Sequence, residues 1–141
     1  MSSVIRQAEE KDIERIRAFT TSAGVSTEGV RGDLDCFYIM ENDFGGLMAV
    51  VAIEQLWKND GLLRSLVLDP KKCEMADVVR FFTVVMSEAD KQGLDALQLI
   101  TPSPEIFESL EFKKVPESEI PEGLRGTVNE KAEGVLMRRE F

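Results

Sequence analysis

The sequence contains no histidine, so proton transfer near neutral pH falls to carboxylates, cysteines, lysines, Tyr38 or water. Glu28 and Glu54 are the candidate bases, because either can orient or deprotonate an amine directly or through water. The alternative is that Glu28 is a solvated loop residue and that Glu54 is an ordinary carboxylate at a sheet edge.

Three further residues are candidates for binding a substrate. Arg64 and Ser65 are adjacent in an apolar run and can face a substrate carboxylate; since side chains alternate along a strand, one of the two faces solvent in the alternative interpretation. Arg125 can clamp a carboxylate or a phosphate, or it is a surface charge.

The cysteines and Tyr38 are expected to be structural unless their surroundings activate them. Cys73 follows Lys71 and Lys72 near a predicted helix start, a setting that lowers the pKa of a thiol, and the alternative is an inert small residue. Cys36 and Cys73 are expected to be reduced thiols. Tyr38 is expected to pack in a sheet with its hydroxyl at the rim.

Residues 62–93 supply the elements that would position this chemistry. The segment reads LLRSLVLDPKKCEMADVVRFFTVVMSEADKQG: a short apolar run between Gly61 and Pro70 that predicts a strand, then a loop, then a helix that Gly93 ends. The helix has apolar residues at steps typical of one buried stripe, namely Met75, Val78, Val79, Phe82, Val85, Met86 and Ala89. A loop that enters a helix N-terminus offers unpaired N–H groups to an anion.

The rest of the chain predicts an α+β fold in a single domain covering residues 1–141. We expect a central mixed, mostly antiparallel sheet of six to seven strands flanked by about four helices. The expected strands are residues 4–6, 34–41, 46–55, 62–68, 94–101, 112–115 and 135–141, and residues 58–61 are expected to form a turn. Asp12 is expected to cap a helix that ends near Gly24.

Composition and charge exclude several classes of protein. The apolar fraction of 43% is typical of a globular domain. A net charge of −9 disfavours nucleic acid and anionic membranes as partners, because both require a basic surface. No secretory signal is evident in the first residues, so a cytoplasmic location is expected, and no metal site is predicted.

Several segments, in order, resemble the GNAT superfamily of N-acetyltransferases over nearly the whole chain. They are the Val-x-x-Pro pattern of Val67 to Pro70 and the segments AGVSTEGV at 23–30, LLRSL at 62–66, IFESLEF at 106–112 and EIPEGLRGT at 119–127. The resemblance is closest to the small amino-acid and arsenic-resistance N-acetyltransferase branch.

This resemblance implies direct transfer of acetyl from acetyl-CoA to the amine of a small molecule, an amino acid or an analogue. Leu66, Val67 and Leu68 would hold the pantetheine through their backbone, with one N–H polarising the thioester carbonyl. Glu28 and Ser65 would be catalytic residues, and Arg64 and Arg125 would bind the substrate.

The loop that would hold the pyrophosphate departs from the family pattern Arg/Gln-x-x-Gly-x-Gly/Ala. The matching segment, 73–78, begins with Cys73 and Glu74 and keeps a small residue only at Ala76, while Val78 stands in place of a small one. Phe107 stands where the family often has a tyrosine, and Glu111 replaces the usual glycine of a Leu-Gly-Phe turn. Weakened acetyl-CoA binding is therefore expected. Two functions stay open: an N-acetyltransferase, or a catalytically impaired GNAT-fold protein that binds or regulates another molecule. A homodimer is considered for the second of these functions.

Overall fold

The computed structural model describes residues 3–23, 36–55, 59–101, 103–120 and 134–141. The strands are β1 Ser3–Gln7, β2 Phe37–Asn42, β3 Leu47–Gln55, β4 Asp60–Leu68, β5 Ala96–Thr101, β6 Lys113–Lys114 and β7 Val135–Glu140. The α-helices are α1 Ile13–Ser22, α2 Met75–Lys91 and α3 Pro104–Glu108, and the 3-10 helices are η1 Glu10–Asp12 and η4 Glu117–Glu119. Among these residues, no helix is both long enough and apolar enough to cross a bilayer.

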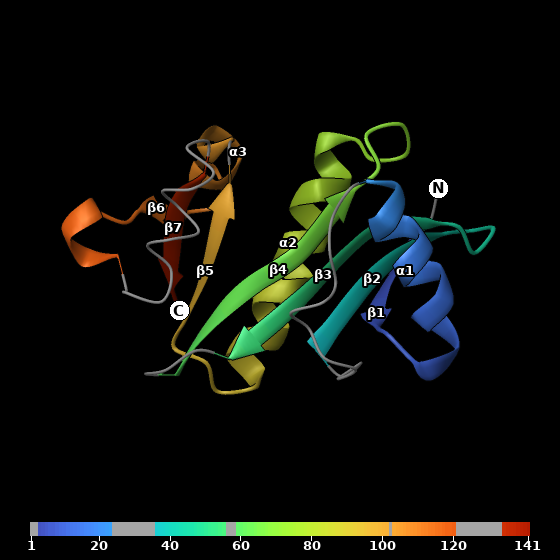
Figure 1. Cartoon of the computed structure of the whole chain (residues 1–141), viewed down its shortest axis with the longest axis horizontal. Helices are drawn as coiled ribbons and strands as arrows, with labels where there is room; N and C mark the ends of the chain where they lie inside the picture. The colour runs from blue at the N-terminus through green and yellow to red at the C-terminus, as the bar shows by residue number, and fades with distance from the viewer. Residues whose placement is uncertain (1–2, 24–35, 56–58, 102, 121–133) are drawn as a thin grey trace.

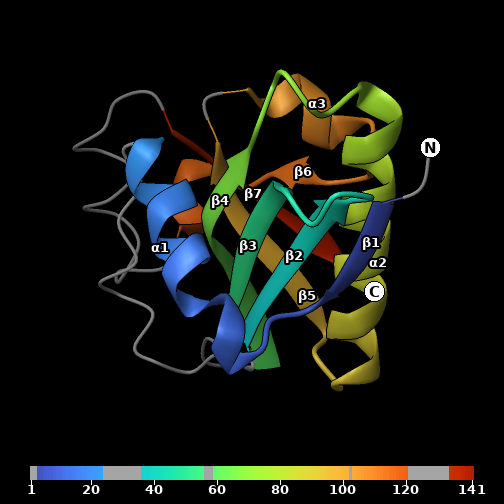
Figure 2. The same ribbon diagram turned by 90° about the vertical axis from the view of Figure 1, so that its right-hand side faces the viewer.

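The seven strands form one sheet in the order β1-β2-β3-β4-β5-β7-β6. All neighbours are antiparallel except β4 and β5, which are parallel and are joined through α2. The expected α+β fold with a mixed, mostly antiparallel sheet is confirmed. Figure 2 shows α1 on one face of the sheet and α2 on the other.

The larger part of the core lies between α2 and the sheet. Phe81, Phe82, Phe107 and Phe112 form a series of edge-to-face ring contacts with centroid separations of 5.1 to 5.9 Å. Such contacts stabilise a core by about 1 kcal/mol each beyond the burial of the rings.

The predicted apolar stripe of α2 is only partly correct. Phe82, Val85, Met86 and Ala89 are buried as predicted, whereas Met75 and Val79 are exposed. Phe81, outside the predicted stripe, is fully buried. The apolar residues of α2 occupy a wide arc of the helix surface. From residue 81 onward, the sheet covers the part of this arc that includes Phe81.

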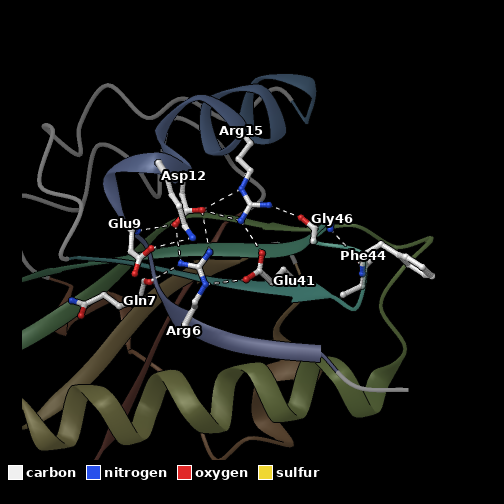
Figure 3. A network of polar contacts seen from close by, with 11 residues as sticks. Arg6, Gln7, Glu9, Asp12, Arg15, Glu41, Phe44 and Gly46 are labelled. Atoms are coloured by element: carbon white, nitrogen blue, oxygen red, sulfur yellow. Dashed lines mark hydrogen bonds and ion pairs between the residues drawn. The ribbon is translucent and has the colours of Figure 1, made fainter.

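A buried ionic network attaches α1 to the sheet (Figure 3). Asp12 is fully buried and accepts hydrogen bonds from Arg6 at 2.8 and 3.1 Å and from Arg15 at 2.8 and 3.2 Å. Glu41 of β2 accepts from the same two guanidiniums, at 2.9 Å from Arg6 and 2.8 Å from Arg15. The arginines hold the pKa values of Asp12 and Glu41 below their ordinary range.

Two local predictions were wrong. The Asp12 side chain does not cap α1; it accepts the Glu9 N–H at 2.8 Å and caps the preceding 3-10 turn while it pairs with the arginines. Residues 60 and 61 open strand β4, so the bounds of the predicted turn were wrong, although β3 and β4 are antiparallel neighbours as a hairpin requires. Gly61 is needed there for close packing, because a Cβ atom at this position would lie 2.9 Å from the side chains of Leu94 and Leu97.

Candidate functional site

Strand β4 carries a β-bulge at Ser65. Arg64 lies opposite Ala52 of β3, but Val67 lies opposite Val50, so two residues of β4 occupy the space opposite Val51. Ser65 absorbs the extra residue by adopting a φ of 53°, in the left-handed region. Leu62 is the last residue of β4 that pairs with β5, so the bulge lies shortly after the point where β5 leaves the strand.

The strands β4 and β5 separate along most of their length. They pair only from Asp60 to Leu62 on β4 and from Ala96 to Gln98 on β5. Figure 1 shows them meeting at one end and diverging towards the other. Within the described residues, β4 therefore pairs with β3 beyond Leu62 but no longer pairs with β5, and an opening lies on that side of the strand. Leu66 and Leu68 are half-buried there, and Val67 is buried.

The loop after β4 uses its own acceptors to satisfy most of its N–H groups. The Asp69 carboxylate accepts the Lys71 N–H at 2.9 Å. The Asp69 carbonyl accepts the N–H groups of Lys72 and Cys73, both at 3.0 Å. A phosphate at this loop would have to compete with these bonds, although Lys71 and Lys72 add positive charge beside it.

The N-terminus of α2 is closed by a capping box. Glu74 and Asp77 each accept the backbone N–H of the other through their carboxylates, and the Asp77 oxygen lies 2.9 Å from the Glu74 nitrogen. Met75 and Ala76, the first helical residues, have no acceptor for their N–H groups within the helix. Two carboxylates thus stand where an anion would bind, and Val78 is half-buried against the core.

Cys73 is not an activated thiol. Burial raises its pKa, Asp77 adds to the increase, and the Sγ atom lies 3.3 Å from the Met48 carbonyl, to which it donates. These surroundings favour the interpretation of Cys73 as an inert small residue. Cys36 and Cys73 are thiols and not disulfide partners, as expected.

Arg64 and Glu54, which the sequence suggested for separate tasks, form an ion pair with each other. Arg64 Nε contacts Glu54 Oε2, and both atoms are shielded from solvent with no other polar partner among the described residues. The side chains as a whole are 40% and 39% exposed. Spacing along the sequence gave no sign of this pair, because the two residues lie on different strands.

The other predicted site residues have mixed outcomes. Glu28 and Arg125 lie outside the described residues. Phe107 is buried among aromatic rings, as a core residue. Glu111 has a φ of 72°, the left-handed conformation that glycine adopts without strain, so glutamate is strained at the position where the family usually has glycine. Tyr38 is buried and its hydroxyl lies 2.6 Å from the Gln92 side-chain amide, which donates to it.

A cavity of about 1400 Å³ lies away from this opening, between the start of β4, β5 and the β6–β7 edge. Asp60 on its wall accepts hydrogen bonds from Gln98 at 2.8 Å and from Arg138 at 2.9 and 3.3 Å. Asp60 and Arg138 are thus paired with each other. No cluster of three metal-ligating side chains occurs in the part of the chain that is described.

The fold of this chain is shared by solved structures of acetyltransferases. A solved acetyltransferase of the GNAT family from Staphylococcus aureus Mu50 has a TM-score of 0.75 at 13% identity, with 99% of each chain covered. N-acetylglutamate synthase from Neisseria gonorrhoeae, complexed with coenzyme A and N-acetyl-glutamate, has a TM-score of 0.81 at 23% identity. That match covers 99% of this chain but only 35% of the synthase.

At the level of sequence, the chain is similar to the uncharacterized protein YwlB of Bacillus subtilis strain 168. The two are 29% identical over 96 residues, which are 68% of this chain and 65% of YwlB. No family model matches the chain.

Proposed function

We propose that this chain is an acetyl-CoA-dependent N-acetyltransferase that acts on the amine of a small molecule. The observation that carries the proposal is the separation of β5 from β4 after Leu62, which leaves the backbone of residues 63–68 open on one side. An extended pantetheine chain carries amide groups that match such an edge. The synthase crystallised with coenzyme A shares this fold.

In this function the backbone of Leu66, Val67 and Leu68 binds the pantetheine arm. A backbone N–H beside the bulge stabilises the negative charge that develops on the thioester oxygen when the amine attacks. Ser65 lies at that point of the strand, and it and Glu28 are the proposed catalytic residues, with Glu54 as the other carboxylate near the opening. The amine nitrogen forms a bond to the acetyl carbon as the C–S bond of the thioester breaks, and the proton that the amine loses ends on the sulfur, so that coenzyme A leaves as a free thiol.

The proposed acceptor is an amino acid or a close analogue. Arg64 lies next to the bulge, and its terminal nitrogens carry donors in the geometry that suits a carboxylate. Arg125 is proposed as the second cation for the acceptor. An amino acid is a small molecule, in keeping with the proposed class of enzyme. We propose that the protein is located in the cytoplasm.

The loop after β4 favours a second function, a GNAT-fold binding or regulatory protein with impaired catalysis. The N–H groups of Lys71, Lys72 and Cys73 are bonded to Asp69, and Glu74 and Asp77 place negative charge at the start of α2. These residues fit a pyrophosphate poorly, whereas the open strand edge fits the pantetheine arm. We therefore expect the chain to bind the whole acetyl-CoA molecule weakly. In this second function we propose that the protein acts as a homodimer.

Release of free thiol from acetyl-CoA, measured with a panel of α-amino acids and their amides, tests the proposal. We expect release that depends on both the protein and an amine, together with an N-acetylated product detected by mass spectrometry. Saturable binding of acetyl-CoA without release with any acceptor would favour the impaired binding protein.

A further inference from the structure

We propose that Glu54 is a positioning residue that orients Arg64, so that the site selects acceptors carrying a carboxylate. This inference rests on the proposed N-acetyltransferase function and deepens it. It assigns to Glu54 a role through Arg64 that differs from that of a general base.

The two side chains lie on the same face of the sheet. Ala52 packs in the core on the α1 side, and Glu54, two residues further along β3, points to that same face because side chains alternate. Arg64 lies directly opposite Ala52, so Glu54 is its diagonal neighbour across the strands. Diagonal pairs are within reach of long side chains, and this one closes as an ion pair.

The ion pair engages only one end of each group. Arg64 Nε and Glu54 Oε2 are shielded from solvent and have no further polar partner in the described segments. The Arg64 side chain is nevertheless 40% exposed, and its two terminal nitrogens have no ion-pair partner among the described residues. A guanidinium has five N–H donors, and four of them are carried by the two terminal nitrogens, where a ligand can bind.

This arrangement fixes the guanidinium before a ligand arrives. An arginine side chain has many rotamers, and binding a ligand through a freely rotating one loses conformational entropy. Glu54 holds the Nε edge, so the terminal nitrogens project away from Glu54 in one orientation. A carboxylate can then bind through the terminal donors without displacing Glu54.

The position along β4 places this donor group near the opening where the proposed function puts the thioester. Arg64 immediately precedes Ser65, the bulge residue, and residue 62 is the last of β4 that pairs with β5. An acceptor held by Arg64 therefore lies beside the opening between the strands. Its amine reaches the opening only when the carboxylate is close to the amine, as in an α-amino acid.

The test compares kcat/KM for each α-amino acid with kcat/KM for its amide, which keeps the amine and lacks the carboxylate. We expect the wild-type protein to prefer the free acid. Glu54→Ala should reduce this preference about tenfold, mainly through the acceptor KM, with the KM for acetyl-CoA unchanged. Glu54→Gln should keep part of the preference, because it retains a side-chain oxygen that can accept from Arg64 although it has no charge.

A double-mutant cycle separates positioning from a purely structural role. In an Arg64→Ala background, where the preference is already lost, Glu54→Ala should change nothing further. Glu88→Ala is the matched control: Glu88 is also 39% exposed and ion-paired, with Lys91 on α2, and its loss should leave the preference intact. An unchanged preference in Glu54→Ala, or an equal decrease with and without Arg64, overturns the inference.

Failure of the proposed function would be recognised separately. If no acceptor yields product, the inference is decided by the NMR signal of the Arg64 Nε–H during titration with the same acids and amides. A shift caused by the acids alone, and absent in Glu54→Ala, supports it. No shift in the wild-type protein, or equal shifts with acids and amides, overturns it.

Discussion

Glu111 and Ser65 both adopt left-handed backbone conformations although neither is glycine, with φ values of 72° and 53°. At Ser65 the strain accompanies the bulge beside the proposed site, where such outliers often occur. At Glu111 it accompanies an ordinary turn between α3 and β6, so its energy can be measured without disturbing the opening.

Replacing Glu111 by glycine and by alanine should separate backbone strain from side-chain contacts. Both variants lose the ion pair with Arg139, in which the Glu111 side chain is 78% exposed and which therefore contributes little. Glu111→Gly should be more stable than Glu111→Ala by about 1 kcal/mol, because only glycine adopts this φ without strain. Urea unfolding gives the comparison, and a less stable glycine variant would contradict the assignment of strain.

Cys73 leads to a prediction about reactivity. Because burial and Asp77 raise its pKa above the ordinary value of 9.0, the thiolate fraction at neutral pH is small. Alkylation by iodoacetamide, followed by peptide mass spectrometry, should be slow at Cys73 and should increase only at pH values above 9.0. Rapid alkylation at pH 7 would show that the thiol is activated after all.

Among the elements, α1 depends most on charge. It is held to β1 and β2 by the network of Arg6, Asp12, Arg15 and Glu41. Removing one partner of a buried network leaves uncompensated charge, so Asp12→Asn should lower the free energy of unfolding by about 3 kcal/mol. Glu14→Gln is the control, since Glu14 is 89% exposed and pairs only with Arg17 on the same helix.

The same network predicts a dependence of stability on pH. The folded chain lowers the pKa values of Asp12 and Glu41 from ordinary values of 3.8 and 4.5, so the charged carboxylates favour folding. Their contribution is complete above these ordinary values and is lost as the pH falls through the lower values of the folded chain. Denaturation curves should show this loss in the wild-type protein and a smaller one in Asp12→Asn; identical acid slopes would count against the network.

The loop between β4 and α2 can be altered without removing its hydrogen bonds. Glu74→Gln combined with Asp77→Asn keeps an oxygen acceptor at each position and removes two negative charges from the helix N-terminus. We expect acetyl-CoA to bind about tenfold more tightly, since each charge at a helix terminus contributes up to about 1 kcal/mol. Acetyl-pantetheine, which has no phosphates, should bind equally to both proteins, and Asp90→Asn in the last turn of α2 is the control.

Much of this element structure could be predicted from the sequence, and the reasons are local. Pro70 and Gly93 bound β4 and α2, and the apolar runs determine the element types. The bulge at Ser65 and the Arg64–Glu54 pair could not be predicted, because they depend on the register between neighbouring strands. Asp12 was misassigned as a helix cap for the same reason: its partners come from β1 and α1, and the network extends to β2.

For the molecule as a whole, the net charge opposes the binding of the proposed cosubstrate. The chain carries a net charge of −9, and the phosphates of acetyl-CoA are also negative. Salt screens repulsion between exposed like charges. Moderate salt should therefore not weaken acetyl-CoA binding, whereas it weakens binding to proteins that have a basic phosphate site. Measurements should therefore be made at physiological ionic strength.

Calorimetric titration of the unmodified protein with acetyl-CoA tests the central claim most directly. The account predicts saturable binding at one site per chain, weaker than that of the Glu74→Gln/Asp77→Asn variant and little affected by removing the phosphates. Thermal unfolding in the presence of excess acetyl-CoA should show a matching increase in Tm. No heat and no increase in Tm, with either protein and with either acetyl-CoA or acetyl-pantetheine, would contradict a cosubstrate site between β4 and β5.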